Sequence, residues 1–320
     1  MSGTLLLSAL VVLNVISFIV SAFVGTGPWR NWTFTVVMHI LLLLTVVLFC
    51  KFSHYDIVQD CGLKNKLSLS TILFTIALTI STFIMGLGTS TIFSYLFESL
   101  GYVNSATMPD TATPLTFALT VLAFCIMPAL SEEFLIRGGV LHGLKKGYSA
   151  YRAIIFSALA FALLHGSVTQ CVHQFVLGIV CAVLVLVGKS LWYSVIFHFL
   201  NNLIAVVLDF LQKSSGVVVE NAVTASEFFS SFSGIGVAVI YTVIGLALTV
   251  GLLYFLLRQR EKKENFSSDD KLSRRLEKFN SYSDYDFLEN KKENVFFWAG
   301  VVIAFAFVIY NFVITISGVV

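Results

Sequence analysis

SEEFLIRGG, residues 131–139, is the stretch on which the organisation of the chain depends. It lies inside an apolar run, from about residue 114 to residue 144, that is long enough to cross a bilayer as a helix. Glu132, Glu133 and Arg137 fall within this run, and an ionised side chain at such a depth costs about 2.5 kcal/mol or more. The stretch therefore predicts a functional site, and the rest of the chain is expected to form the scaffold that shields these charges.

Composition indicates the class of protein. Hydrophobic residues make up 57% of the 320 residues and charged residues 12%, against about 25% charged residues in a soluble domain. The net charge of +2 and the lack of a Gly-rich phosphate loop give no sign of nucleic-acid binding. The five cysteines are scattered without a CxxC pair, which argues against a zinc ribbon or a disulfide framework. The first apolar run has no basic segment before it and is expected to be retained rather than cleaved.

The apolar residues recur in blocks of about 20, the length that a helix needs to cross hydrocarbon. They predict an all-α polytopic membrane protein with about nine transmembrane helices, at 4–25, 33–50, 68–92, 114–136, 152–169, 171–188, 191–211, 233–257 and 296–319. We divide the chain into N-terminal transmembrane helices (1–113), a core (114–211) and C-terminal transmembrane helices (212–320). The last part contains a charged linker at 258–294, which is expected to be cytoplasmic.

Lysine and arginine residues predict the orientation in the membrane. With a cytoplasmic N-terminus, the internal loops are 51–67, 137–151, 189–190 and 258–295. Together with Arg152 at the edge of a span, these loops hold 18 of the 20 basic residues. The sequence therefore predicts a cytoplasmic N-terminus, and nine spans would place the C-terminus outside.

Three stretches place polar side chains at membrane depth, at 132–137, 161–165 and 198–202. Their distances from the nearest basic residue at the expected cytoplasmic end are similar: Glu132 is 13 residues from Lys145, His165 is 13 from Arg152, Asn202 is 13 from Lys189 and His198 is 9 from Lys189. At 1.5 Å per helical residue, 13 residues span about 20 Å and nine span about 14 Å. The stretches are expected to meet in one layer, provided that the Gly138-Gly139 pair does not break the first helix.

Spacing within each stretch suggests roles. Arg137 is four residues from Glu133 and shares its helix face, so it is expected to compensate that carboxylate. Glu132 points about 100° away and lacks a local partner, which makes it a candidate general base. The sequence thus separates a supporting carboxylate from a reactive one.

The other two stretches suggest complementary roles. His198 and Asn202 share a face and are candidates for joint donation to a developing oxyanion. His165 is a candidate for orienting or polarising a water molecule. His142 and His173 match no such pattern and are interpreted as incidental.

The three stretches resemble the motifs of the CAAX protease and bacteriocin-processing family of intramembrane proteases (the CPBP or Abi family). EExxxR, FxxxH and HxxxN occur in the family's order, at Glu132-Glu133 to Arg137, Phe161 to His165 and His198 to Asn202. One departure is Ile136, where an aromatic residue often precedes the arginine. The resemblance covers about residues 114–205 and implies a helical bundle enclosing a polar cavity open to the cytoplasm.

The resemblance also implies an activity. The chain is expected to be an intramembrane endopeptidase of the CAAX protease type, which hydrolyses a peptide bond with a glutamate-activated water. The implied catalytic residues are Glu132, His165, His198 and Asn202, with Glu133 and Arg137 in support. Metal-free chemistry is implied, although one Glu and two His residues would also suit zinc. HExxH is lacking.

Other functions stay open at this point. A non-proteolytic immunity or partner-binding protein would retain the same residues for shape and hydrogen bonding. A proton-coupled transporter is a further alternative, because such proteins also use buried Glu and His residues. The expected partners are the lipid bilayer and a peptide or protein substrate, either lipidated or unmodified. Short loops favour a bacterial cell membrane; in an endomembrane, a prenylated protein would be the natural substrate.

Overall fold

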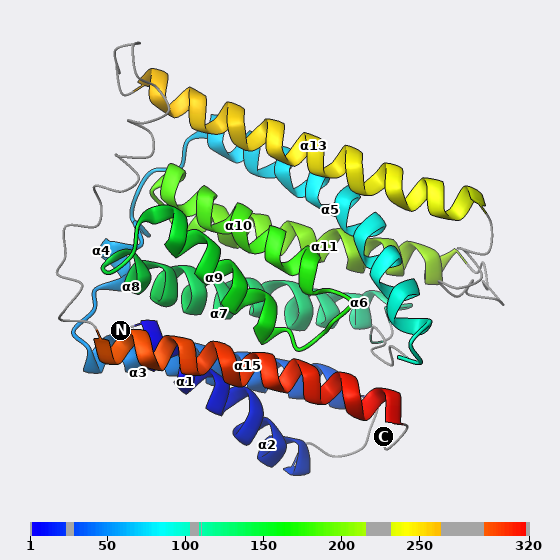
Figure 1. The fold of residues 1–320 in the computed structure, drawn as a ribbon, viewed down its shortest axis with the longest axis horizontal. Coiled ribbons are helices and arrows are strands. Elements are labelled where there is room, and N and C mark those ends of the chain that lie inside the picture. Colours follow the sequence, from blue (N-terminus) through cyan, green and yellow to red (C-terminus); the bar gives the residue numbers. More distant parts are fainter. Residues whose placement is uncertain are drawn as a thin grey trace.

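The computed structural model describes residues 2–23, 29–102, 109, 111–215, 232–263 and 291–317, and every regular element in these ranges is a helix. Figure 1 shows the long helices lying side by side with their axes roughly aligned. On one flank α13 (Phe232–Lys263) packs along α5 (Leu69–Glu98), and on the other α15 (Lys291–Ser317) packs along α1 (Ser2–Val11). The helices that carry the three motifs lie between these pairs, so the polar residues are shielded from both sides.

Seven helices in the described ranges are long and apolar enough to cross a membrane, against about nine expected. The first expected span is divided into α1, the π-helix η1 (Val12–Ile16) and α2 (Ser17–Phe23). The fifth is the 15-residue helix α9 (Ala150–Leu164), whose length of about 22 Å is less than the roughly 30 Å of bilayer hydrocarbon. The all-helical membrane fold is confirmed, with fewer full-length spans than expected. The charged linker lies mainly outside the described residues.

The helix that carries EExxxR is continuous from Pro114 to Lys145. It consists of α6 (Pro114–Thr120), η2 (Val121–Ile126), α7 (Met127–Glu133), η3 (Phe134–Leu141) and α8 (His142–Lys145), of which η2 and η3 are π-helical. Pro128 explains the first π-helix, because its ring crowds the carbonyl of Phe124 four residues earlier and it has no N–H to donate to it. Thr113 caps the start of the helix by accepting a hydrogen bond from the Thr116 N–H.

The Gly138-Gly139 pair does not interrupt this helix, so the assumption behind the depth comparison holds. The two glycines allow close packing instead. A Cβ atom on Gly138 would lie 3.0 Å from Ile57 Cδ1, and one on Gly139 would overlap the side chain of Leu5. The pair therefore lets α1 and α4 (Ile57–Asp60) approach the long helix from different sides.

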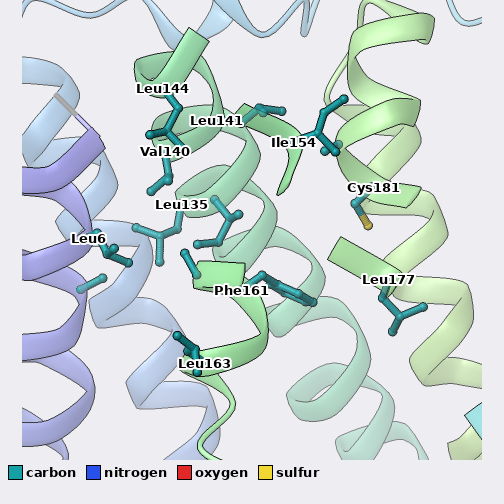
Figure 2. Close-up of a cluster of buried hydrophobic side chains, with 14 of the residues drawn as sticks. Leu6, Leu135, Val140, Leu141, Leu144, Ile154, Phe161, Leu163, Leu177 and Cys181 are labelled. Carbon is teal, nitrogen blue, oxygen red and sulfur yellow. The ribbon is translucent and has the colours of Figure 1, made fainter. Parts of the chain in front are cut away.

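A hydrophobic core surrounds this helix (Figure 2). It joins α1, η3, α8, α9 and α10 (Cys171–Gly188), and its labelled members in the figure are Leu6, Leu135, Val140, Leu141, Leu144, Ile154, Phe161, Leu163, Leu177 and Cys181. Gly178 of α10 packs against Ala158 of α9 so closely that a Cβ atom would lie 2.8 Å from the alanine. This packing brings α9 and α10 against the EExxxR helix.

Candidate active site

The glutamate and arginine of the first motif form a buried ion pair. Arg137 Nη1 donates to Glu133 Oε1 at 2.7 Å, and both side chains are 0% exposed. Arg137 Nη2 donates to the Gly178 carbonyl at 3.1 Å, and its guanidinium lies 4.4 Å from the centre of the Phe161 ring. The predicted pair is therefore present, and the arginine also connects the long helix to α9 and α10.

His198, in α11 (Trp192–Ser214), joins this pair from a third direction. Its Nδ1 lies 2.9 Å from Glu133 Oε1, and the side chain is 8% exposed. A carboxylate accepts hydrogen bonds, so His198 Nδ1 carries the hydrogen and Nε2 is left for another partner. Phe161 packs edge-on against the His198 ring with centroids 5.8 Å apart.

Glu132 faces a different histidine. Its Oε2 lies 3.7 Å from His165 Nε2, and the two side chains are 21% and 22% exposed. Glu132 Oε2 is buried and has no hydrogen-bond partner among the described residues. His165 Nδ1 donates to the Phe161 carbonyl at 2.8 Å, which directs Nε2 towards the carboxylate. The two adjacent glutamates therefore have separate environments, as their angular offset predicts.

Asn202 lies one turn after His198 on α11, and its amide is held by the backbone of η2. Asn202 Nδ2 donates to the Phe124 carbonyl at 3.0 Å. This is the carbonyl that lacks an α-helical donor because residue 128 is a proline. Pro128 thus creates the acceptor that orients Asn202.

The structure brings together the three sequence stretches as expected from their depth. Glu132 meets His165, while Glu133 meets Arg137 and His198, and the Phe161 ring contacts the arginine and both histidines. Asn202 sits beside this group and contacts Phe124. The catalytic roles assigned to these residues, and the polar cavity, remain predictions.

The two histidines interpreted as incidental, and two further polar residues of α11, lie in defined structural surroundings. His142 Nδ1 donates to the Arg137 carbonyl at 2.6 Å and thus stabilises η3. The ring of His173 packs where Gly86 leaves room for it. Asn201, off the His198 face, donates to Thr82 Oγ1 at 3.1 Å, and Asp209 pairs with Lys213 at 2.9 Å.

Sequence reasoning missed His39 in α3 (Arg30–Phe52). Its Nδ1 lies 2.7 Å from Ser131 Oγ, beside Glu132. The depth comparison contained the necessary signal, because His39 is 12 residues, or about 18 Å, from Lys51 at the expected cytoplasmic end. A histidine in an otherwise apolar helix at that depth belongs with the other three stretches.

The loop before α5 also holds η3. Tyr55 donates its hydroxyl hydrogen to the Gly138 carbonyl at 2.8 Å, and the Cys61 thiol lies 3.5 Å from the same oxygen. Burial raises the pKa of the Tyr55 phenol and raises the pKa of the Cys61 thiol to about 12. Both groups are therefore neutral at pH 7 and act as fixed hydrogen-bonding groups beside the helix.

The described side chains include no group of three or more His, Cys, Asp or Glu residues arranged to hold a metal ion. His198 Nδ1 is bonded to Glu133, and Glu132 faces His165. The sequence-based alternative of a zinc site thus finds no ready ligand set in this part of the chain.

Residues 114–204 match the family model described as "Type II CAAX prenyl endopeptidase Rce1-like". The curated proteins and the solved structures give no match. The matched segment contains all three motifs, so the resemblance seen in the sequence is confirmed. At the level of the family, the match supports a membrane protease.

Proposed function

We propose that this multi-pass membrane protein, with its Rce1-like segment at 114–204, is an intramembrane endopeptidase in which Glu132 activates the attacking water. One observation carries the proposal: Glu132 Oε2 is buried without a hydrogen-bond partner among the described residues and faces His165 Nε2 at 3.7 Å. With Nδ1 of His165 donating to a carbonyl, both facing atoms are acceptors in the neutral form of the histidine. A water molecule that donates one hydrogen to each would satisfy both and would present its lone pairs to a substrate carbonyl.

Glu132 would then accept the proton as the water oxygen attacks the peptide carbon. The proton would pass to the amine nitrogen as the C–N bond breaks, so the carboxylate is regenerated. His165 holds the water by its second hydrogen. This division explains why Glu132 is the candidate base rather than Glu133, whose Oε1 is already held by Arg137 and His198.

The oxyanion that forms on the substrate needs donors. Because Glu133 holds the hydrogen of His198 Nδ1, donation from Nε2 requires the imidazolium form of His198. Asn202 offers its second amide hydrogen, the first being used on Phe124.

The substrate that we propose is a peptide or protein presented at the membrane, with a lipidated C-terminal segment as the first candidate given the family description. We also propose the orientation that the basic loops predict, with the N-terminus in the cytoplasm. The chemistry is proposed to be metal-free.

The test is cleavage by purified protein in detergent, with peptides and lipidated peptides as substrates, with and without a chelator. Glu132→Gln is expected to reduce kcat by about 10²–10⁴-fold, because it removes the base but keeps the shape. The matched control is Glu98→Gln, which changes a carboxylate at the far end of α5 and should leave cleavage unchanged.

Unchanged cleavage by Glu132→Gln would refute the assignment of the base, and loss of activity with chelator that is reversed by zinc would refute metal-free chemistry. If wild type binds the panel but cleaves none of it, the non-proteolytic alternative is favoured.

A further inference from the structure

Three helices outside the EExxxR helix each contribute one histidine to the surroundings of Glu132. His165 directly follows α9, His198 lies in α11 and His39 lies in α3. Glu132, His198 and His165 all lie close enough to the His39 ring to act on it electrostatically. His39 lies outside residues 114–204, so the family match assigns it no role.

We propose that His39 is a positioning residue for Glu132. Through its hydrogen bond to Ser131, it fixes the last turn of α7 so that the Glu132 carboxylate faces His165. The inference rests on the proposed function of Glu132 as the base.

The hydrogen bond of Ser131 supports this role. Serine and threonine in apolar helices commonly bond to a carbonyl three or four residues earlier in the same helix, as Thr45, Thr75 and Thr79 do here. Ser131 is 0% exposed and bonds across the interface to His39 at 2.7 Å. Removing His39 would leave the buried Ser131 hydroxyl without this partner at a cost in free energy, so the bond specifies how the two helices fit together.

The interface around this bond is a continuous face of α3. Trp32, two turns before His39, donates its indole N–H to Thr120 Oγ1 at 2.8 Å. Trp32, Met38, Leu42 and Val46 are the buried residues of α3, and they follow the same face. A buried hydrogen bond at Trp32 and a partly buried one at His39 therefore fix the position of α3 along the EExxxR helix, one near each end of the segment from η2 to α7.

The position of Ser131 makes the bond relevant to chemistry. Ser131 immediately precedes Glu132, so a rotation of this turn moves the carboxylate relative to His165. The helix is π-helical on both sides of α7, in η2 and η3, so the α-helical hydrogen-bond ladder does not continue through the flanking turns. A hydrogen bond from another helix supplies part of that constraint.

The kinetic test uses His39→Phe, His39→Asn and Ser131→Ala, with His54→Asn as a control at an exposed histidine. Asparagine places a polar atom near the position of Nδ1, so it can keep the bond to Ser131. We expect His39→Phe and Ser131→Ala each to lower kcat about tenfold with KM within twofold. The double variant should be no slower than either single variant, because both remove one interaction, and His39→Asn should recover most of kcat.

An unchanged kcat in Ser131→Ala would overturn the proposal. It would also be overturned if the two reductions in kcat multiplied in the double variant, or if the substitutions changed KM instead of kcat. If His39→Phe does not fold, the pair His39→Asn and Ser131→Ala still decides the matter. An active His39→Asn beside a slow Ser131→Ala supports the role through the hydrogen bond, whereas an inactive His39→Asn with a normal Ser131→Ala overturns it.

A second readout does not depend on cleavage. Protein with ¹⁵N-labelled histidine rings is compared by NMR in wild type, Ser131→Ala, Glu132→Gln and the control Asp60→Asn, with the His39 signal identified by its loss in His39→Asn. The His39 ring nitrogens should shift in Ser131→Ala and Glu132→Gln and not in the control. A His39 signal that is insensitive to both changes overturns the inference. If the expected shifts occur in a protein that cleaves no substrate, the positioning role of His39 is supported although the proposed function has failed.

Discussion

Replacing Arg137 with methionine is expected to lower the free energy of unfolding by about 3–5 kcal/mol, the usual effect of removing one partner of a buried ion pair. The structure explains the size of the effect. Arg137 and Glu133 are both 0% exposed and 2.7 Å apart, and the arginine also donates to Gly178 and lies over Phe161. Methionine fills much of the same volume, so the loss comes mainly from the carboxylate that it leaves uncompensated.

The double variant Glu133→Gln/Arg137→Met separates charge from packing. It removes both charges, so it should be more stable than Arg137→Met alone. It should nevertheless remain inactive, because a neutral amide then replaces the carboxylate that holds the hydrogen of His198 Nδ1. Stability and catalysis are thus expected to recover differently.

Unfolding is measured by titration with a denaturing detergent, followed by tryptophan fluorescence, and cleavage is measured on the same preparations. Arg258→Met is the control, since that guanidinium lies on the exposed side of α13 and 5.7 Å from the Tyr254 ring; a change within about 0.5 kcal/mol is expected there. The reasoning is refuted if Arg137→Met is as stable as wild type, or if the double variant is less stable than Arg137→Met.

Three further predictions concern the backbone and the loop that support the site. Pro128→Ala supplies the missing N–H of the helix and competes with Asn202 for its carbonyl, so kcat should fall about tenfold with KM unchanged; normal peptide cleavage would contradict this. Because burial raises the pKa of Cys61 to about 12, its labelling by maleimide at pH 8, followed by mass spectrometry, should be slow in the folded protein and rapid after unfolding, when the pKa returns to about 8.5. The folded state holds this proton more tightly, so the contribution of Cys61 to stability should decline as the pH rises above about 9, and rapid labelling of folded protein would disprove its burial. Gly139→Ala places a methyl group against a buried leucine of α1 and should cost about 1–3 kcal/mol in the same unfolding titration, whereas Gly147→Ala, with nothing within 4 Å, should change stability by no more than about 0.5 kcal/mol.

The central ion pair and the meeting of the three motifs could be predicted because both follow from helix geometry. Four residues separate Glu133 from Arg137, and four residues place two side chains on one helix face. Equal distances from basic residues place Glu132 and His165 at one depth, and the structure has them facing each other. The separate environments of Glu132 and Glu133 follow from the same geometry.

The end of α9 was predicted wrongly, because the expected span extended over the partly polar residues 166–169. The predicted span runs to residue 169, but the helix ends at Leu164, and Gly166 adopts a φ of +64°, a conformation in which glycine is favoured. The face of α3 that packs inwards was also hidden, because the helix is apolar on nearly every side and its pattern has no preferred direction. His39 was the available signal, and only the depth comparison could have used it.

The partner of Asn202 illustrates another limit. Pro128 indicates that a carbonyl four residues earlier lacks its donor. The side chain that donates to this carbonyl instead is determined by how α11 packs beside η2, and no local sequence pattern contains that information.

The hydrogen bonds that hold the EExxxR helix have a consequence for attempts to build chimeras. Tyr55 bonds to Gly138, Trp32 to Thr120 and His39 to Ser131. The first residue of each pair precedes residue 114. Residues 114–204 therefore do not form a transferable cassette. A chimera that grafts this segment onto a foreign bundle would carry every motif residue and still lack these three contacts, and it should include α3 and the loop up to α5 if the grafted glutamates are to keep their positions.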